Sequence, residues 1–389
     1  MHIELPQPDA AARRHSARLT ARIAERIRGA DGWINFAEFM QLALYEPGLG
    51  YYSAGAVKFG EAGDFVTAPE ISPLFSRCLA QQLAPLLGDQ GAADILEPGA
   101  GNGTLAVDVL RELAHVNALP RRSRILEPSA ALRAVQAERV AGLPAELAAR
   151  VEWLDTWPTA LRGIVIANEV VDALPVRRFQ IGTDGIAEWG VELAGTRLRE
   201  SVRPADAAFA ARVRARLGAP ADYPPGYSSE LAEQAPAWLA SLSEVLEEGL
   251  IVLFDYGFSR PEYYLPERTS GTLRCYYRHR AHEDPLFWPG LQDLTAWVDF
   301  SALAERAAAS GLEVAGYTTQ AQFLLAGGIA ELVPPLAAAG AAEQAALAGG
   351  LRTLLLPGEM GDAVKVLALR RGDCALPAGL GGRDMRSSL

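Results

Sequence analysis

From residue 93 onward, short apolar runs alternate with stretches of helical periodicity. This alternation restricts the fold strongly, because strands that are each followed by a helix form a parallel sheet covered by those helices. Seven apolar runs are candidate strands: 93–96, 124–126, 151–154, 164–167, 250–254, 313–317 and 363–369. We therefore predict an α/β fold around a mostly parallel sheet of seven strands.

Two long segments interrupt the alternation. Residues 176–248 contain a section of strand-like alternation, and residues 258–300 are rich in Tyr, Arg, His and Pro. We interpret both as insertions after strands, at the edge where open α/β sheets bind ligands. Residues 1–90 are predicted to form a helical N-terminal region with a Gly-rich loop, residues 91–370 the sheet domain, and residues 371–389 a flexible tail.

The composition limits the partners of the chain. A net charge of −11 repels phosphate backbones, so we expect no binding to nucleic acid. The three cysteines are far apart, which argues against a disulfide framework and favours a reducing compartment, so we predict a cytoplasmic protein. No uncharged apolar run is long enough to span a membrane. No metal site is expected, because His279 and His282 lack a clear third ligand.

The sharpest motif follows the first candidate strand. The strand ends in Glu97, and the turn after it contains Gly99, Ala100, Gly101 and Gly103. Glycines allow positive φ angles and a close approach to a ligand, and the next helix begins with free N–H groups. The G-x-G-x-G spacing differs from the G-x-G-x-x-G of dinucleotide sites, and a P-loop lysine is absent. A tight turn without a ligand stays an alternative.

Acidic residues also follow the second and third candidate strands. Glu127 can accept hydrogen bonds from both hydroxyls of a ribose. A nicotinamide cofactor would use the same contact, so Glu127 indicates a nucleoside without identifying it. Asp155 is a candidate for contact with an adenine amino group, and a role in a turn or helix cap is its alternative.

The fourth candidate strand ends abruptly in polar residues, namely Asn168, Glu169 and Asp172. Asn168 can cap a helix or contact a cofactor. The two carboxylates can bind a guanidinium group and orient it. A carboxylate can also accept a proton that a bound guanidinium group loses in a reaction. Glu169 is therefore the first catalytic candidate, and Asp172 is the second.

Two longer motifs resemble those of one known family. Residues 63–72 resemble its G-D-F-x-T-x-P-E-I-S signature, and residues 168–175 resemble its N-E-x-x-D-A-L-P signature. Shorter matches follow at residues 271–274, 289–290, 293–295, 298–301, 319–320, 360–361 and 365–367. On these motifs, the sequence resembles the MidA-type class I S-adenosylmethionine-dependent methyltransferases over roughly residues 20–370. That family includes the mitochondrial arginine methyltransferase of complex I assembly.

This resemblance implies a Rossmann-like class I methyltransferase fold and S-adenosyl-L-methionine as the cofactor. It implies that Glu97 and the glycine turn hold the methionine part of the cofactor. Asp64, Thr67 and Pro69 lie in a loop that either closes over the cofactor or caps the helix predicted from Pro73. It further implies methyl transfer to an arginine of a protein substrate whose identity is unknown, with a possible link to respiratory complex assembly. A homodimer is also compatible with the sequence. The alternatives are a non-catalytic assembly factor that binds the cofactor, and a nicotinamide-dependent oxidoreductase.

Overall fold

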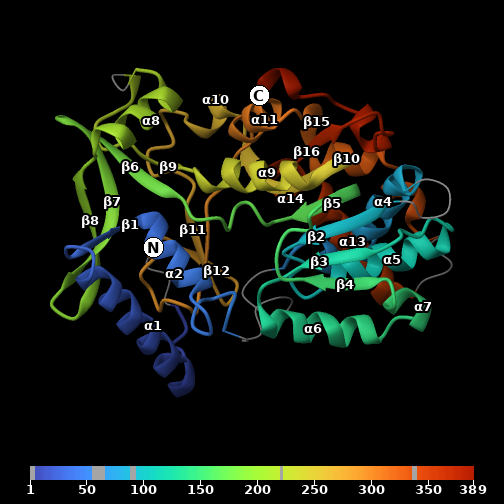
Figure 1. The fold of residues 1–389 in the computed structure, drawn as a ribbon, viewed down its shortest axis with the longest axis horizontal. Coiled ribbons are helices and arrows are strands. Elements are labelled where there is room, and N and C mark those ends of the chain that lie inside the picture. The colour runs from blue at the N-terminus through green and yellow to red at the C-terminus, as the bar shows by residue number, and fades with distance from the viewer. Residues whose placement is uncertain (1–4, 55–65, 88–92, 220–221, 335–339) are drawn as a thin grey trace. The chain divides into compact units, whose positions relative to one another are not determined.

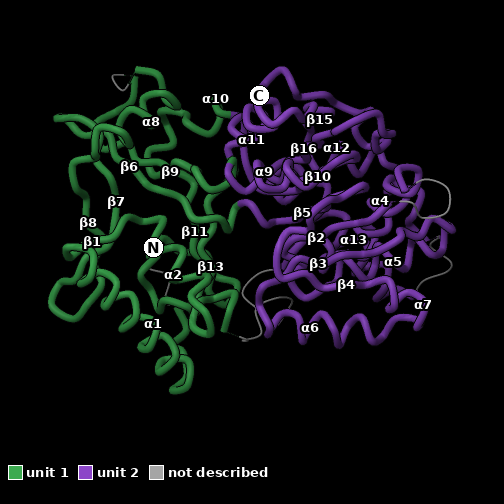
Figure 2. The backbone as a smooth tube through the Cα atoms, in the orientation of Figure 1, with its two compact units in different colours: residues 1–65, 172–236, 260–298 green, residues 66–171, 237–259, 299–389 purple. Residues whose placement is uncertain are grey.

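The computed structural model describes residues 5–54, 66–87, 93–219, 222–334 and 340–389 (Figure 1). The chain forms two compact units (Figure 2). Unit 1 comprises residues 1–65, 172–236 and 260–298. Unit 2 comprises residues 66–171, 237–259 and 299–389.

The central sheet of unit 2 has the strand order β15-β16-β10-β5-β2-β3-β4. Its strands are β2 (Asp94–Pro98), β3 (Ser123–Leu126), β4 (Val151–Leu154), β5 (Leu161–Asn168), β10 (Leu246–Phe258), β15 (Glu313–Thr319) and β16 (Val364–Arg371). Strands β10, β5, β2, β3 and β4 run parallel, whereas β16 is antiparallel to both of its neighbours. All seven predicted strands are therefore present.

The predicted number of strands was nevertheless one too low. An eighth strand, β14 (Val298–Asp299), pairs with β10 beside the main path. A strand of two residues has no apolar periodicity of its own, so the sequence pattern could not reveal it.

Helices from several parts of the chain pack on this sheet. They are α3 (Ala68–Ile71), α4 (Pro73–Leu83), α5 (Thr104–His115), α6 (Ala130–Ala141), α7 (Ala145–Ala148), α9 (Gln234–Val245), α11 (Phe300–Ala309), α12 (Gln320–Ala326), α13 (Ala341–Leu355) and α14 (Met360–Ala363). Phe254 of β10 meets the rings of Phe75 on α4 and Phe323 on α12 edge to face. These three rings are fully buried in the main core of unit 2.

Unit 1 contains two smaller antiparallel sheets. One has the order β1-β7-β6-β9, with β8 paired to β7, and the other has the order β12-β11-β13. The strands are β1 (Trp33–Asn35), β6 (Arg177–Gly182), β7 (Gly185–Ala194), β8 (Arg197–Pro204), β9 (Ser228–Leu231), β11 (Arg274–Tyr277), β12 (Arg280–His282) and β13 (Asp293–Thr295). Helices α1 (Ala10–Arg28), α2 (Phe36–Tyr45), α8 (Ala207–Leu217) and α10 (Arg260–Tyr263) complete the unit. Its core joins the apolar stripe of α1 to Phe36 and Phe39 of α2.

The boundaries of the two units differ from the domain boundaries that the sequence predicts. Residues 66–87, expected in the N-terminal region, belong to unit 2, because Ala68 and Phe75 are buried in its core. Residues 237–248, expected in the first insertion, also belong to unit 2. Residues 176–236 and 260–298 of the two insertions join the N-terminal helices in unit 1, so these parts of the chain form one body.

The C-terminal segment is packed on unit 2, in contrast to the flexible tail expected from its glycines. The N–H of Gly379 donates to Oε1 of Gln82 (2.7 Å), and the N–H of Met385 donates to the carbonyl of Tyr317 (2.8 Å). A Cβ atom at Gly379 would lie 2.4 Å from the carbonyl oxygen of Phe323. This glycine thus permits a close backbone contact, and it does not loosen the chain.

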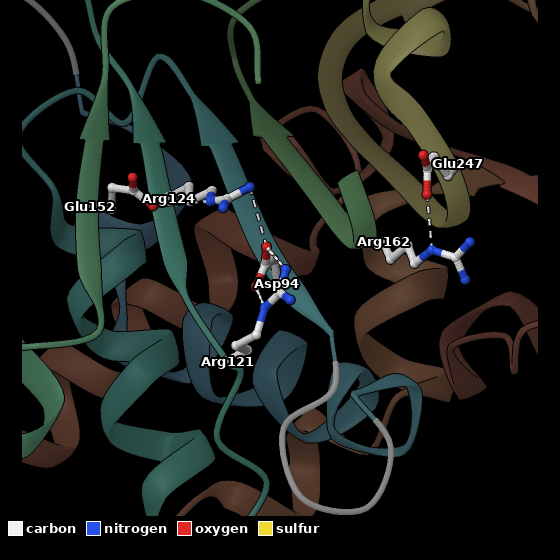
Figure 3. Close-up of polar contacts among 6 residues, drawn as sticks. All are labelled: Asp94, Arg121, Arg124, Glu152, Arg162 and Glu247. Carbon is white, nitrogen blue, oxygen red and sulfur yellow. Dashed lines mark hydrogen bonds and ion pairs between the residues drawn. The ribbon is translucent and has the colours of Figure 1, made fainter. Parts of the chain in front are cut away.

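Ion pairs connect residues at the amino ends of the central strands (Figure 3). Asp94 is fully buried at the start of β2, and Arg121 donates two hydrogen bonds to its carboxylate (2.8 and 2.7 Å). Arg124 of β3 approaches the same carboxylate to 3.2 Å and also binds Glu152 of β4. The acid that begins β2 is therefore neutralised by two cations.

Candidate functional site

The opposite edge of the central sheet collects most of the predicted site residues. Because β5, β2, β3 and β4 are neighbouring parallel strands, their carboxyl ends lie at one edge. Glu97 is the penultimate residue of β2, and Glu127, Asp155 and Glu169 follow β3, β4 and β5 directly. All four carboxylates belong to unit 2.

The glycine turn has the backbone geometry that the sequence predicted. Gly99, Gly101 and Gly103 have φ angles of 67°, 54° and 83°, in the region that favours glycine. A Cβ atom at Gly99 would lie 3.1 Å from a methyl group of Val170, so this turn also packs tightly against the chain after β5. Ala100 is buried between these glycines.

Glu97 is a buried carboxylate without a partner among the described residues. Its exposed fraction is 6%, and no residue in the described part of the chain donates a hydrogen bond to it or pairs with it. Burial alone raises the pKa of Glu97 to about 8. A buried polar group without a partner costs free energy unless a ligand or water completes it. Glu97 is therefore suited to bind a donor group of a ligand.

Glu127 is joined to the glycine turn through Gln136 of α6. The carboxylate of Glu127 accepts hydrogen bonds from the N–H of Ser129 (2.8 Å) and from Nε2 of Gln136 (3.3 Å). Nε2 of Gln136 also donates to the carbonyl of Gly101 (2.9 Å), and its Oε1 accepts from the indole of Trp153 (2.9 Å). The contact between Glu127 and the hydroxyls of a ribose stays a prediction.

Sequence reasoning missed Gln136, although a signal for it existed. It is fully buried on the same helix face as Leu132 and Val140, one turn away from each. A polar residue within such an apolar stripe indicates a buried hydrogen-bond network, since an unpaired amide there would be costly.

Asp155 lies at the surface of unit 2. Its side chain is 85% exposed and pairs with Arg133 of α6 (2.9 Å). Arg133 also donates to the carbonyl groups of Glu127 and Leu154, and so joins the ends of β3 and β4. The contact between Asp155 and an adenine amino group stays a prediction.

Glu169 has an unusual backbone and a perturbed carboxyl group. Its φ angle is 53°, a region that residues other than glycine rarely adopt. Its Oε1 accepts hydrogen bonds from the N–H of Ala68 (3.1 Å) and from Nδ2 of Asn168 (3.0 Å). Burial and the charge of Asp255 raise the pKa of Glu169 to about 8. Among the described residues, Oδ1 of Asn168 is buried without a partner.

Asp255 explains the sharp turn after β5. It is buried, its Oδ2 accepts from the N–H groups of Val170 (3.2 Å) and Val171 (2.8 Å), and its Oδ1 accepts from the N–H of Tyr256 (2.9 Å). Two of these donors, Val170 and Val171, follow Glu169 directly, so Asp255 holds the turn that carries Glu169.

The other predicted site residues are distributed differently. Asp172 belongs to unit 1, where its carbonyl accepts from the N–H of Ala296 (2.9 Å). Burial, and to a smaller extent nearby charges that include Asp172, raises the pKa of Tyr52 and of Tyr276. The contact between Asp172 and a guanidinium group stays a prediction. Thr67 and Pro69 lie at the start of α3, and Asp64 lies outside the described residues.

The residues of this edge fit S-adenosylmethionine. The buried carboxylate of Glu97 and the orphaned Oδ1 of Asn168 are acceptors without donors in the described part of the chain, whereas the cofactor carries amino and hydroxyl donors. The glycine turn lets the backbone approach such a ligand closely. No group of three or more His, Cys, Asp or Glu side chains that could hold a metal ion occurs among the described residues.

Known proteins resemble the chain closely in sequence and structure. It is 30% identical to the "Protein arginine methyltransferase NDUFAF7 homolog, mitochondrial" of Drosophila melanogaster, over 94% of this chain and 88% of that protein. The corresponding Mus musculus protein is 31% identical, over 87% and 81%. A solved structure of a "likely methyl transferase" from Burkholderia thailandensis, bound to S-adenosyl-homocysteine, is 40% identical with a TM-score of 0.91, over 99% of this chain and 100% of that one.

These comparisons overturn the predicted location of the protein. The curated relatives are named as mitochondrial proteins, which contradicts a cytoplasmic location. The cysteine content on which that prediction depended indicates only a reducing environment, and it does not distinguish one reducing compartment from another. Within the described residues, no helix is both long and apolar enough to cross a membrane.

Residues 78–318 match the family described as "Putative S-adenosyl-L-methionine-dependent methyltransferase". This match covers more than half of the chain and includes the glycine turn, Glu127 and Glu169. The fold is that of the class I methyltransferases, with S-adenosylmethionine as the cofactor. The chain therefore belongs to the family of S-adenosylmethionine-dependent methyltransferases and is an enzyme of the MidA type.

Proposed function

We propose that this enzyme methylates a side-chain nitrogen of an arginine in a protein substrate, and that Glu169 binds the guanidinium group. The names of the relatives, which are protein arginine methyltransferases, support the choice of acceptor. The observation that supports the proposal most directly is the hydrogen bonding of the Glu169 carboxylate. Only its Oε1 accepts hydrogen bonds from the described residues, so Oε2 is available to a donor of the substrate.

The raised pKa of Glu169 suits the two tasks that arginine methylation requires. Near neutral pH, a carboxyl group with a pKa of about 8 is mostly protonated. An approaching guanidinium group favours the ionised form, so binding of arginine releases a proton from Glu169. The carboxylate formed in this way can accept the proton that the guanidinium group must lose on methylation.

The cofactor supplies a methyl group already activated by its sulfonium sulfur. The protein must hold the acceptor nitrogen in line with that methyl group and keep water out. Glu169 is suited to this positioning because its own orientation is restrained by Ala68 and Asn168, while the N–H groups of Val170 and Val171 bind Asp255 and hold its turn.

Three finer expectations remain proposals. Asp172 is the second candidate for contact with the guanidinium group. A link to the assembly of a respiratory complex rests on the family resemblance, and a homodimer rests on the sequence. A non-catalytic assembly factor that binds the cofactor is the competing function. It predicts cofactor binding without methyl transfer to any protein.

The experiment compares wild-type protein with the Glu169→Gln variant. Purified protein is incubated with methyl-labelled S-adenosylmethionine and a lysate of cells that lack this protein, and the labelled amino acid is identified after hydrolysis. We expect labelled methylarginine from the wild type, a loss of at least about 100-fold in the variant, and little change in cofactor affinity by calorimetry. The Glu247→Gln variant, which alters an exposed ion pair with Arg162, is the matched control.

Three outcomes would contradict the proposal. Methylarginine formation at the wild-type rate by the Glu169→Gln variant would exclude Glu169 as the binding residue. Equal losses of methyl transfer and cofactor affinity would make Glu169 a cofactor ligand instead. Cofactor binding by the wild type without labelling of any protein would favour the non-catalytic assembly factor.

A further inference from the structure

The glycine turn and the short helix α3 are joined by one side chain, that of Glu70. Oε1 of Glu70 accepts a hydrogen bond from Nδ2 of Asn102 in the glycine turn (2.7 Å). Oε2 accepts from the N–H (3.1 Å) and the hydroxyl (3.2 Å) of Thr67, which precedes α3. One carboxylate thus connects two segments that are more than 30 residues apart in the sequence.

The direction of the hydrogen bond between Asn102 and Glu70 follows from the neighbouring contacts. Oδ1 of Asn102 accepts from the backbone N–H (3.0 Å) and the hydroxyl (2.6 Å) of Thr104. A backbone N–H can only donate, so the amide oxygen must face Thr104 and the amide nitrogen must face Glu70. Glu70 therefore accepts through a charge-assisted hydrogen bond, which is stronger than a neutral one.

Helix α3 is itself held firmly within unit 2. Ala68 is fully buried in the main core, and Pro69 is buried as well. A Cβ atom at Gly350 of α13 would lie 3.0 Å from the carbonyl oxygen of Ile71, so α13 packs directly on the end of α3. The N–H of Ala68 meanwhile donates to Oε1 of Glu169 (3.1 Å). A side chain that is hydrogen-bonded to α3 is therefore held by a well-packed helix.

We propose that Glu70 is a positioning residue for the cofactor. By holding Asn102 against the fixed helix α3, Glu70 sets the conformation of the glycine turn, and the same helix sets the orientation of Glu169. Cofactor affinity and the position of Glu169 are thereby coupled through α3. The inference rests on the cofactor of the family and is independent of the proposed arginine acceptor.

The test exchanges the donor and the acceptor of the hydrogen bond between Asn102 and Glu70. In Glu70→Gln, two amide nitrogens face each other, and in Asn102→Asp, two carboxylates do. In the double variant, Gln at 70 can donate to Asp at 102, while its oxygen still accepts from Thr67 and the second oxygen of Asp still accepts from Thr104. All of the hydrogen bonds are restored with the donor reversed.

The measurement is the affinity of each full-length variant for S-adenosyl-homocysteine by titration calorimetry, with thermal unfolding of the same samples. We expect each single variant to bind about 10-fold more weakly or worse, because a hydrogen bond to a charged group is lost. The double variant should recover to within about 3-fold of wild type. Wild-type affinity in either single variant, or additive losses in the double variant, would overturn the proposal.

The control is Glu112→Gln, which makes the same chemical change in another bridging carboxylate of unit 2. Glu112 of α5 binds Arg77 (3.0 Å) and Gln81 (2.7 Å) of α4. It should lower thermal stability without changing the affinity. If Asp at 102 prevents folding, the alanine variants of Glu70 and Asn102 replace the exchange. The double alanine variant should then bind no more weakly than the weaker single, and additive losses would again contradict the inference.

Discussion

Strand β2 has a buried carboxylate near each end, and the two differ in their partners. At the amino end, Asp94 is fully buried and is bound by Arg121 and Arg124 (Figure 3). At the carboxyl end, Glu97 is almost as buried but has no partner among the described residues. Only three positions of one strand separate the two acids.

This difference indicates that the two acids have different roles, one in stability and one in ligand binding. Asp94 is compensated by its own protein, so its contribution is to the folded state. Glu97 is left uncompensated at the edge where the parallel strands end, and its pKa rises to about 8 as a result. A protein keeps such a group at a cost in stability when a ligand completes it. We therefore expect the ligand at the carboxyl edge, whereas the ion pairs at the amino edge stabilise the fold.

The largest expected effect is on the pH dependence of stability. The folded-state pKa of Glu97, about 8, lies above the ordinary value near 4.5. The folded protein therefore holds a proton that the unfolded chain releases, so the contribution of Glu97 to stability is complete below about pH 4.5 and is lost as pH rises to about 8. The loss amounts to up to about 5 kcal/mol.

Urea unfolding of ligand-free wild type and Glu97→Gln from pH 4.5 to pH 9 measures this contribution. Groups common to both proteins cancel in the difference between the two curves. Parallel curves over the whole range would show that Glu97 ionises normally and would remove the contrast with Asp94.

Replacing the compensated acid should have the next largest effect. Asp94→Asn removes the shared partner of two arginines, and breaking a buried ion pair in this way should lower the free energy of unfolding by about 3 kcal/mol. Urea unfolding gives the loss, and calorimetry on the folded variant should show unchanged affinity for S-adenosyl-homocysteine. A loss of affinity as large as that of a cofactor-edge variant would mean that the two ends are not independent.

The uncompensated acid should respond in the reverse sense. Glu97→Gln should weaken binding of S-adenosyl-homocysteine by about 10-fold to 100-fold, because a charge-assisted hydrogen bond to the ligand is lost. The ligand-free variant at pH 8 should be at least as stable as wild type, since a buried charge is removed. A stability loss comparable to that of Asp94→Asn would show that Glu97 has a structural partner.

The smallest effect is expected at Gln136, which supports the functional edge from α6. Gln136→Leu leaves the indole N–H of Trp153 and the carbonyl of Gly101 without their partner. We expect a loss of about 1–2 kcal/mol in the free energy of unfolding and a few-fold weaker cofactor binding. Unfolding and titration calorimetry check both. Unchanged values would show that water replaces the amide.

Local patterns in the sequence were sufficient to predict where the strands of the central sheet lie along the chain. They also predicted the conformation of the glycine turn. Apolar periodicity placed all seven strands of the main path, because the buried parallel strands are continuous apolar runs. The G-x-G-x-G spacing predicted positive φ angles, because glycine alone adopts them easily. The positions of Glu127, Asp155 and Glu169 after their strands followed from the same patterns.

What lay beyond those patterns depends on contacts between distant residues. The carboxylates of Asp94 and Glu97 have the same chemistry in the sequence, and only the arginines brought beside Asp94 by β3 and the segment before it distinguish them. Gln136 and Glu70 act through partners on other elements, and Asp172 joins unit 1 although it stands three residues from Glu169. Periodicity reports which face of an element is buried, whereas the partner of a buried polar group depends on the packing of the whole chain.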